Sequence, residues 1–271
     1  MSSPLLPLIV EPELLERHLG EARLFLVDLC QRDAYLQSHI PGAVHLGYAQ
    51  IVRAQPPMLG LLPDNASLEQ LFSAIGLRRD HHVVAYDEEG GSRAARLLWT
   101  LDVIGHPAFS LLNGGLTAWQ DEQRPLTDII APRPPSDYRI DRADRPLATK
   151  DYVLAHLHDP GVVLLDTRSP GEFRGVDKRA ARAGHIPGAV NLDWIRAMDV
   201  TRGLRFKPAE ELRAAFTAVG VTPDKEIVVY CQTHHRSAHT YMVLKMLGYP
   251  RVRAYPGSWS EWGNDPDTPI E

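Results

Sequence analysis

The chain carries the same series of motifs twice, and this duplication restricts its fold more than any other feature of the sequence. H-I-P-G-A-V occurs at His39 to Val44 and again, letter for letter, at His185 to Val190. Each copy follows an apolar, strand-like run that contains an aspartate, L-F-L-V-D-L in the first case and V-V-L-L-D-T in the second. Two such copies predict two domains of the same kind.

Two further landmarks repeat in the same order. V-V-A-Y-D-E-E-G-G-S-R from Val83 aligns with I-V-V-Y-C-Q-T-H-H-R-S from Ile227. N-G-G-L-T-A-W, which ends at Trp119, aligns with Y-P-G-S-W-S-E-W, which ends at Trp262. Three landmarks in one order indicate a duplicated domain rather than chance similarity.

Within each half, short apolar runs alternate with helical patterns. A-S-L-E-Q-L-F-S-A-I-G-L places apolar residues three and four apart and stops at Gly76, which is typical of a helix with a glycine at its end. Continuously apolar strands between helices predict a parallel sheet that is buried on both faces. The expected fold class is therefore α/β, with two tandem domains, each a mainly parallel sheet flanked by helices on both faces.

The domain boundaries follow from a proline-rich stretch. Ile130 to Pro146 has mixed charge, four prolines and no apolar period, so it predicts an extended linker. We expect a first domain at 1–128, a linker at 129–146 and a second domain at 147–271.

Composition excludes several classes of protein. A net charge of -5 gives no broad basic surface for nucleic acid. The N-terminus lacks the pattern of a signal peptide, and no apolar run reaches the roughly 18 residues that cross a bilayer. Two cysteines, Cys30 and Cys231, cannot form a disulfide framework and would stay as thiols in a reducing compartment. We therefore expect a cytoplasmic protein without nucleic-acid or membrane partners.

Cys231 lies where a strand turns into a helix, at the sheet edge where α/β proteins bind ligands. Backbone N–H groups that curl into a helix start form a cradle for anions, and the helix dipole adds positive charge. The fixed charge of Arg236 should further favour the thiolate, which is the nucleophilic form, and His234 and His235 can add donors or titratable charge. In the first half the alignment places Asp87 at this position, so that copy should be catalytically silent.

The tandem repeat, the two H-I-P-G-A-V motifs and the loop C-Q-T-H-H-R together resemble the two-domain rhodanese family of sulfurtransferases, in its bacterial form. The resemblance covers essentially the whole chain. It implies that Cys231 attacks the sulfane sulfur of thiosulfate or a similar donor, releases sulfite and becomes a persulfide. Cyanide or a thiol then takes the sulfur, and neither a cofactor nor a metal takes part.

The resemblance also implies a set of binding residues. Arg236 would bind the sulfonate of the donor, and backbone N–H groups from Gln232 to Ser237 would stabilise the persulfide. Arg174 comes from a region that supplies arginines to the substrate in related enzymes. The expected substrate-binding residues are Arg236, Gln232, Thr233, His234, His235, Ser237 and Arg174.

Several alternatives stay open. The donor could be 3-mercaptopyruvate, because Arg236 is the only permanent cation in the loop. The chain could also be a persulfide carrier for a sulfur-accepting protein, or a regulatory module. A cysteine phosphatase is less favoured, since its loop has five residues between cysteine and arginine and this one has four. His234 and His235 are either a solvent-facing pair or a tuning device. We expect a monomer that meets a small-molecule donor and a thiophilic acceptor.

Overall fold

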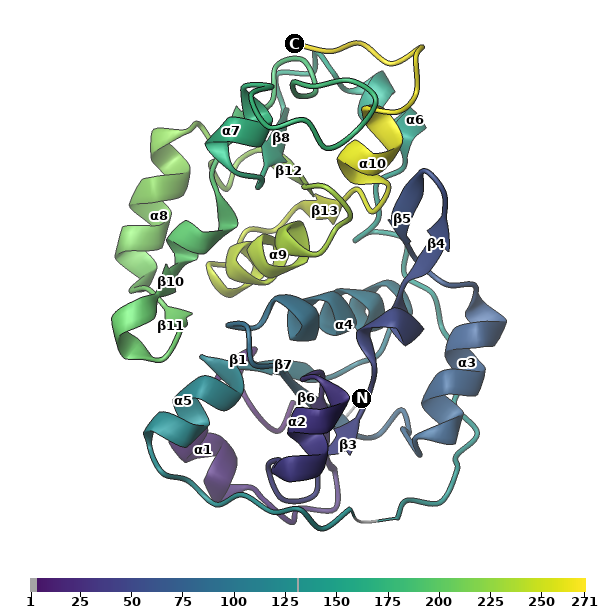
Figure 1. Ribbon diagram of the computed structural model, residues 1–271, viewed down its shortest axis with the longest axis vertical. Coiled ribbons are helices and arrows are strands. Elements are labelled where there is room, and N and C mark those ends of the chain that lie inside the picture. The colour runs from purple at the N-terminus through teal and green to yellow at the C-terminus, as the bar shows by residue number, and fades with distance from the viewer. Residues whose placement is uncertain (1–3, 131) are drawn as a thin grey trace. The chain divides into compact units, whose positions relative to one another are not determined.

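A computed structural model describes residues 4–130 and 132–271 (Figure 1). The start of the predicted first domain, residues 1–3, and one position of the predicted linker, residue 131, lie outside the described residues. Within the described ranges, no helix is long and apolar enough to span a membrane.

One compact unit contains residues 1–51, 63–144 and 199–206. Its sheet has the order β1-β7-β6-β2-β3, and every neighbouring pair is parallel. All five residues of both β2 and β6 are buried, as their continuous apolar runs predict. Its elements are β1 (Ile9–Val10), α1 (Pro12–Arg17), β2 (Leu24–Asp28), α2 (Arg32–Gln37), β3 (Val44–His45), η1 (Tyr48–Ile51), α3 (Asn65–Ala74), β6 (His82–Tyr86), α4 (Ser92–Val103), β7 (Phe109–Leu112), α5 (Gly115–Asp121), η3 (Val200–Arg202) and β11 (Arg205–Phe206).

The second unit contains residues 52–62, 145–198 and 207–271. Its sheet has the order β13-β12-β8-β9, and its pairs are again all parallel, so the predicted α/β class is confirmed for both halves. Its elements are β4 (Arg53–Gln55), β5 (Met58–Leu61), α6 (Lys150–Ala155), β8 (Val162–Asp166), α7 (Pro170–Phe173), β9 (Val190–Asn191), η2 (Trp194–Ala197), β10 (Met198–Asp199, whose last residue is assigned to the other unit), α8 (Ala209–Ala218), β12 (Glu226–Tyr230), α9 (Arg236–Met246), β13 (Val252–Ala254) and α10 (Ser258–Trp262).

Two short segments lie within one half of the sequence but belong to the compact unit of the other half. Residues 52–62 pack with the second unit and include the β4–β5 hairpin, which Figure 1 shows beside α10. Residues 199–206 pack with the first unit. Cutting the sequence at a single linker does not predict that each half contributes a segment to the unit of the other half. The domain boundaries at residues 128 and 146 stay a prediction.

The duplication is visible in matching contacts. Asp28 on β2 pairs in register with Tyr86 on β6, and Asp166 on β8 pairs in the same way with Tyr230 on β12. Each tyrosine hydroxyl accepts a hydrogen bond from the backbone N–H of the isoleucine in H-I-P-G-A-V, at 3.1 Å in the first unit and 3.3 Å in the second. The residues that the two halves share therefore form the same hydrogen bond, from isoleucine to tyrosine, in each unit.

Both H-I-P-G-A-V motifs form the same tight turn. The N–H of Ala43 bonds to the carbonyl of Ile40 at 3.0 Å, and Ala189 and Ile186 do the same. Proline occupies the second position of the turn, and a glycine with φ of 82° or 74° occupies the third, as a type II turn requires. The motif fixes the path of the chain and carries no reactive group.

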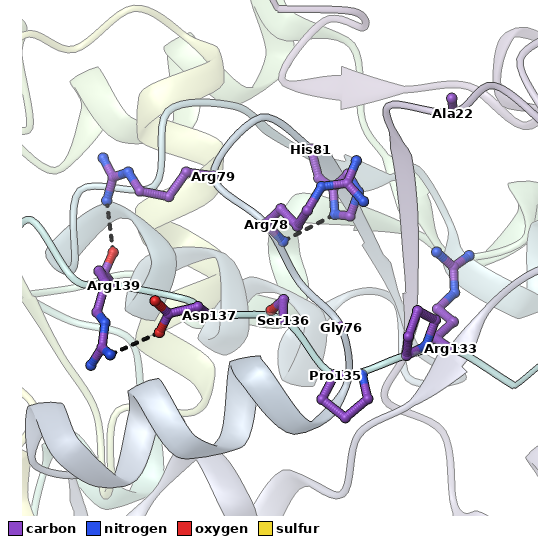
Figure 2. A pocket seen from close by; sticks show the side chains of 11 residues that line it. Ala22, Gly76, Arg78, Arg79, His81, Arg133, Pro135, Ser136, Asp137 and Arg139 are labelled. Carbon is purple, nitrogen blue, oxygen red and sulfur yellow. Dashed lines mark hydrogen bonds and ion pairs between the residues drawn. The ribbon is translucent and has the colours of Figure 1, made fainter.

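A cavity of about 550 Å³ in the first unit lies where the linker passes the turn after α3 (Figure 2). Four arginines line it, but most of them have carboxylate partners. Arg78 pairs with Asp80 at 3.1 Å, and Arg139 pairs with Asp137 at 2.8 Å. Arg79 donates to the carbonyl of Arg139 at 3.3 Å, and the N–H of Ser136 donates to the carbonyl of Ser73 at 2.9 Å. These two hydrogen bonds attach the predicted linker to α3 and the turn after it.

Candidate active site

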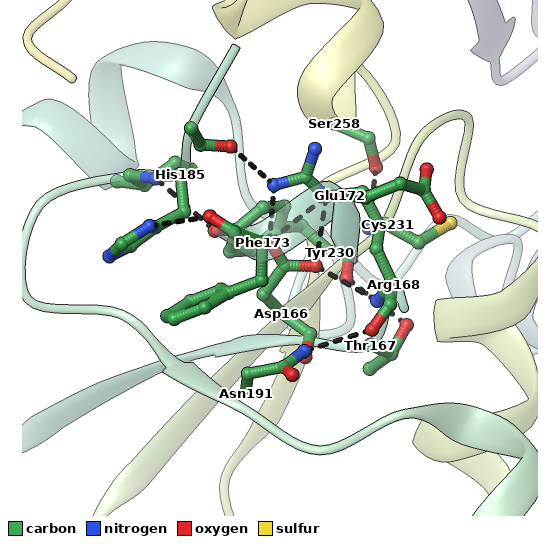
Figure 3. Close-up of polar contacts among 12 residues, drawn as sticks. Asp166, Thr167, Arg168, Glu172, Phe173, His185, Asn191, Tyr230, Cys231 and Ser258 are labelled. Atoms are coloured by element: carbon green, nitrogen blue, oxygen red, sulfur yellow. Dashed lines mark hydrogen bonds and ion pairs between the residues drawn. The ribbon is translucent and has the colours of Figure 1, made fainter. Parts of the chain in front are cut away.

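The thiol of Cys231 follows directly after β12 and precedes α9. Its side chain is fully buried. Its backbone carbonyl accepts a hydrogen bond from the N–H of Trp259 at 2.9 Å, and its N–H donates to the hydroxyl of Ser258 at 3.3 Å (Figure 3). The residue is therefore held between the end of a central strand and the start of α10.

The surroundings of Cys231 favour its thiolate. Burial acts in the opposite direction and raises the pKa of the thiol, because it removes water from the charged form. The positive charge of Arg236, the hydroxyl and N–H of Ser237 and the N–H of Thr233 more than offset this, and the pKa of Cys231 is lowered. The cradle of N–H groups that the sequence indicates is thus formed by Thr233 and Ser237.

His234 is part of the fold of the loop. It is fully buried and has a φ of 52°, in the left-handed region that non-glycine residues seldom adopt. Its Nδ1 lies 2.7 Å from the hydroxyl oxygen of Ser237. A solvent-facing role is wrong for His234, because its ring orients the hydroxyl that contacts the thiol. His235 is partly exposed and lies at the N-cap of α9.

Arg236 makes a bidentate ion pair with Glu172. Its two terminal nitrogens donate to the two carboxylate oxygens at 2.6 and 2.9 Å. Burial raises the pKa of Glu172, yet the hydrogen bonds and charge of Arg236 dominate with the help of the Ser169 N–H, and the net pKa is lowered. Sequence reasoning missed Glu172. Its only local signal is the S-P-G-E pattern of a capping box, which forms at the start of α7.

A second ion pair joins Asp166, the last residue of β8, to Arg168 (Figure 3). Arg168 donates to Asp166 at 2.6 Å and to the carbonyl of Gly184 at 2.8 Å, and its guanidinium lies 4.5 Å from the ring centroid of Trp259. Both partners are almost completely buried. We interpret this pair as structural, since its charges are satisfied within the protein.

Gln232 and Thr233 contact neighbouring segments of the protein through their carbonyl groups, and Gln232 also does so through its side chain. The Gln232 carbonyl accepts from the N–H of Ser260 at 2.9 Å, and its side-chain amide donates to the carbonyl of Arg179 at 3.0 Å. The carbonyl of Thr233 lies against Gly60 of β5, where an added Cβ would come within 1.9 Å of the oxygen. The sequence analysis did not predict a role for Gly60 either, because Gly60 is far from the Cys231 loop in the sequence.

Arg174 is exposed at the end of α7. In the described parts of the chain, no hydrogen bond or ion pair joins its side chain to the Cys231 loop. Its role in donor binding stays a prediction.

The corresponding loop of the first unit has the same cradle with a different anion in it. The Asp87 carboxylate accepts four backbone hydrogen bonds, from Glu89, Gly91 and Arg93 at 2.8 Å and from Ala94 at 2.9 Å. The cradle is therefore filled by the side chain of the protein itself, and it offers no nucleophilic sulfur.

Cys30 is unsuited to nucleophilic chemistry. It is buried in the core of the first unit. Burial raises the pKa of its thiol strongly, and the negative charge of Asp28 raises it further. This thiol is an inert part of the core.

Across the described residues, no three histidine, cysteine or acidic side chains are grouped so that they could hold a metal ion. His239, which the sequence places near the loop, is buried and lies edge on to Trp194, with 5.2 Å between the ring centroids.

Comparison with known proteins finds relatives that match the chain over nearly its whole length. The model of the rhodanese-like domain matches residues 11–122 and 149–265. The thiosulfate sulfurtransferase of Azotobacter vinelandii is 47% identical over 266 residues, which cover 98% of this chain and 97% of the relative. The sulfur carrier protein TtuD of Thermus thermophilus is 36% identical, over 97% of this chain and 95% of its own length. The crystal structure of YnjE superposes with a TM-score of 0.87 at 21% identity, covering 97% of this chain and 68% of that one, and it supports the fold alone.

Proposed function

The chain belongs to the rhodanese family, whose domain it contains twice, and on this premise we propose that it is a sulfurtransferase. It moves a sulfane sulfur from thiosulfate, or a similar donor, to a thiophilic acceptor such as cyanide or a thiol. The observation that carries the proposal is the Cys231 thiol with its lowered pKa, in contact with the N–H groups of Thr233 and Ser237.

The proposed reaction has two steps. The Cys231 thiolate attacks the outer sulfur of thiosulfate, the S–S bond of the donor breaks, and sulfite leaves with the electron pair. A persulfide remains on Cys231. Cyanide then attacks the terminal sulfur, leaves as thiocyanate and restores the thiolate, so the kinetics should be ping-pong.

Each residue of the Cys231 loop, and Arg174 outside it, has a proposed role in this two-step reaction. The N–H groups of Thr233 and Ser237 stabilise the thiolate and the persulfide anion. His234 holds the Ser237 hydroxyl in place. Arg236 and Arg174 are the proposed contacts for the negative charge of the donor, and Gln232 and His235 complete the loop.

Delivery of the sulfur to a protein acceptor is a second candidate function. The relative that is named a sulfur carrier favours it, since it aligns over nearly the whole chain. In either role the chain would work as a monomer in the reducing cytoplasm, where Cys231 stays a free thiol. A 3-mercaptopyruvate donor would keep the mechanism and change the leaving group.

Intact mass spectrometry tests the proposal. The reduced protein is incubated with thiosulfate, and Cys231→Ser and Cys30→Ser are treated in parallel. We expect the wild type and Cys30→Ser to gain the mass of one sulfur atom, which cyanide removes, and Cys231→Ser to gain nothing. If no donor among thiosulfate, mercaptopyruvate and an alkyl persulfide adds sulfur to Cys231, the sulfurtransferase proposal is wrong.

A further inference from the structure

Glu172 neutralises the one permanent cation of the Cys231 loop. From Cys231 to Ser237, Arg236 is the only lysine or arginine. Both terminal nitrogens of its guanidinium are bound to the Glu172 carboxylate, and the Glu172 side chain is only 6% exposed. The pair is therefore short, bidentate and mostly shielded from solvent.

The charges around the thiol add up unfavourably for an anionic donor. The Arg236 and Glu172 charges offset one another, and so do those of Arg168 and Asp166. The Cys231 thiolate then adds a negative charge. Burial raises the pKa of a third carboxylic acid, Asp193, and Arg196 is near enough to offset its charge, so the thiolate is the charge that remains.

A doubly charged donor therefore meets two obstacles. It is repelled by the net negative charge of the site, and it must compete with Glu172 for Arg236. When Arg236 turns to the donor, the buried Glu172 carboxylate loses its partner, which is a costly change for a buried charge. A donor without the sulfonate charges avoids both obstacles, because its binding leaves the ion pair intact.

We propose that Glu172 is a specificity-determining residue that acts through Arg236 and selects against dianionic donors, in favour of alkyl persulfides with no other charge. This inference rests on the proposed sulfurtransferase function. In the favoured step the Cys231 thiolate attacks the terminal sulfur of the alkyl persulfide. The donor S–S bond breaks, the alkyl thiolate leaves with the electron pair, and the proton of the donor persulfide stays on the new Cys231 persulfide or passes to water.

The experiment measures single-turnover rate constants for persulfide formation with two probes, thiosulfate and 2-hydroxyethyl persulfide. Glu172→Gln keeps a group that can take part in the capping box but removes the charge. We expect its thiosulfate rate constant to rise about tenfold, equivalent to about 1.4 kcal/mol. The rate constant for 2-hydroxyethyl persulfide, which has no sulfonate and carries at most one negative charge, should change little. Glu172→Asp, which keeps the charge but reaches less far, should lie between Glu172→Gln and the wild type.

Ser169→Ala is the matched control. Ser169 is the other half of the capping box, and its hydroxyl accepts from the N–H of Glu172 at 3.2 Å. This variant disturbs the start of α7 and leaves both members of the ion pair in place. The ratio of the two rate constants should therefore equal that of the wild type.

The outcomes separate the inference from the function on which it rests. If wild-type Cys231 accepts sulfur from neither probe and not from mercaptopyruvate either, the proposed function fails. If it accepts sulfur but Glu172→Gln changes both rate constants by the same factor, or slows thiosulfate, the inference alone is wrong. Should Glu172→Gln not fold, the Glu172→Asp variant decides, because an unchanged ratio there overturns the inference as well.

Discussion

The contact between the β4–β5 hairpin and the Cys231 loop can be tested by one methyl group. Gly60 lies on β5 and is buried. In Gly60→Ala the new Cβ would lie 1.9 Å from the carbonyl oxygen of Thr233, 2.5 Å from its carbonyl carbon and 2.9 Å from its Cα. All three are backbone atoms, so no side-chain rotation can relieve the overlap.

The size of the effect follows from these distances. The optimal distance between non-bonded heavy atoms is about 3.5 Å. Because the new Cβ would lie 1.9 Å from the Thr233 carbonyl oxygen, β5 and the loop must move apart by about 1.5 Å. Overpacking of this kind costs about 1–3 kcal/mol of unfolding free energy. The N–H of Thr233 also contacts the thiol of Cys231. Because a displacement of about 1 Å in a reactive group can slow a reaction about 100-fold, we expect a loss of that order in the rate of persulfide formation.

The assay combines stopped-flow persulfide formation with thermal unfolding. Gly47→Ala is the control for the substitution itself, since its Cβ would meet only the flexible side chain of Gln50, at 3.3 Å. Leu59→Ala removes an exposed side chain from the same hairpin. We expect both controls to react at nearly the wild-type rate. If Gly60→Ala reacts as fast as Gly47→Ala, the hairpin does not position the loop and the reasoning is refuted.

Three other predictions follow from the charges. Arg236→Gln should raise the pKa of the Cys231 thiol and shift the midpoint of its alkylation by iodoacetamide to higher pH, because Arg236 stabilises the thiolate; an unchanged midpoint would contradict this. Asp87→Asn places an amide NH₂, which cannot accept hydrogen bonds, where one carboxylate oxygen accepts two of the four N–H groups. Two N–H groups lose their acceptor, so urea titrations should show a loss of about 2–5 kcal/mol of unfolding free energy. Burial lowers the pKa of both His82 and His106 to about 4, whereas the unfolded chain takes up protons below about pH 6.5. The unfolding free energy should therefore fall as the pH decreases from about 6.5 to about 4, and a flat profile in urea titrations would count against buried neutral rings.

The sequence could predict the parts of the site that depend on neighbouring residues. The apolar run of β12 places Cys231 at a strand end, and the turn that leads into the helix at Arg236 makes the N–H cradle together with the first turn of that helix. Both features arise within about ten residues, where periodicity and residue type are informative. The α/β class and the duplication were predictable for the same reason, since each strand and each motif is a local pattern.

The partners of the loop could not be predicted, because they come from distant parts of the chain. Arg236 and Glu172 are 64 residues apart. The S-P-G-E pattern of Ser169 to Glu172 predicts the start of a helix but does not say which cation its carboxylate will meet. Gly60 belongs to the first half of the repeat, and nothing in its neighbours indicates a contact with Thr233. Pairings of this kind depend on the tertiary path of the chain.

The two anion cradles explain how a domain with an aspartate in the loop can keep the backbone arrangement of a domain with a cysteine there. Several N–H groups that converge on one point, away from water, need an acceptor there, because a buried donor without a partner is costly. In the first unit the Asp87 carboxylate accepts all four of its hydrogen bonds permanently. In the second unit the acceptor is the Cys231 sulfur, which is anionic as a thiolate and remains so as an ionised persulfide. An apolar residue at position 87 would leave all four N–H groups without an acceptor, so a first-unit loop that has no cysteine favours an acidic side chain over an apolar one.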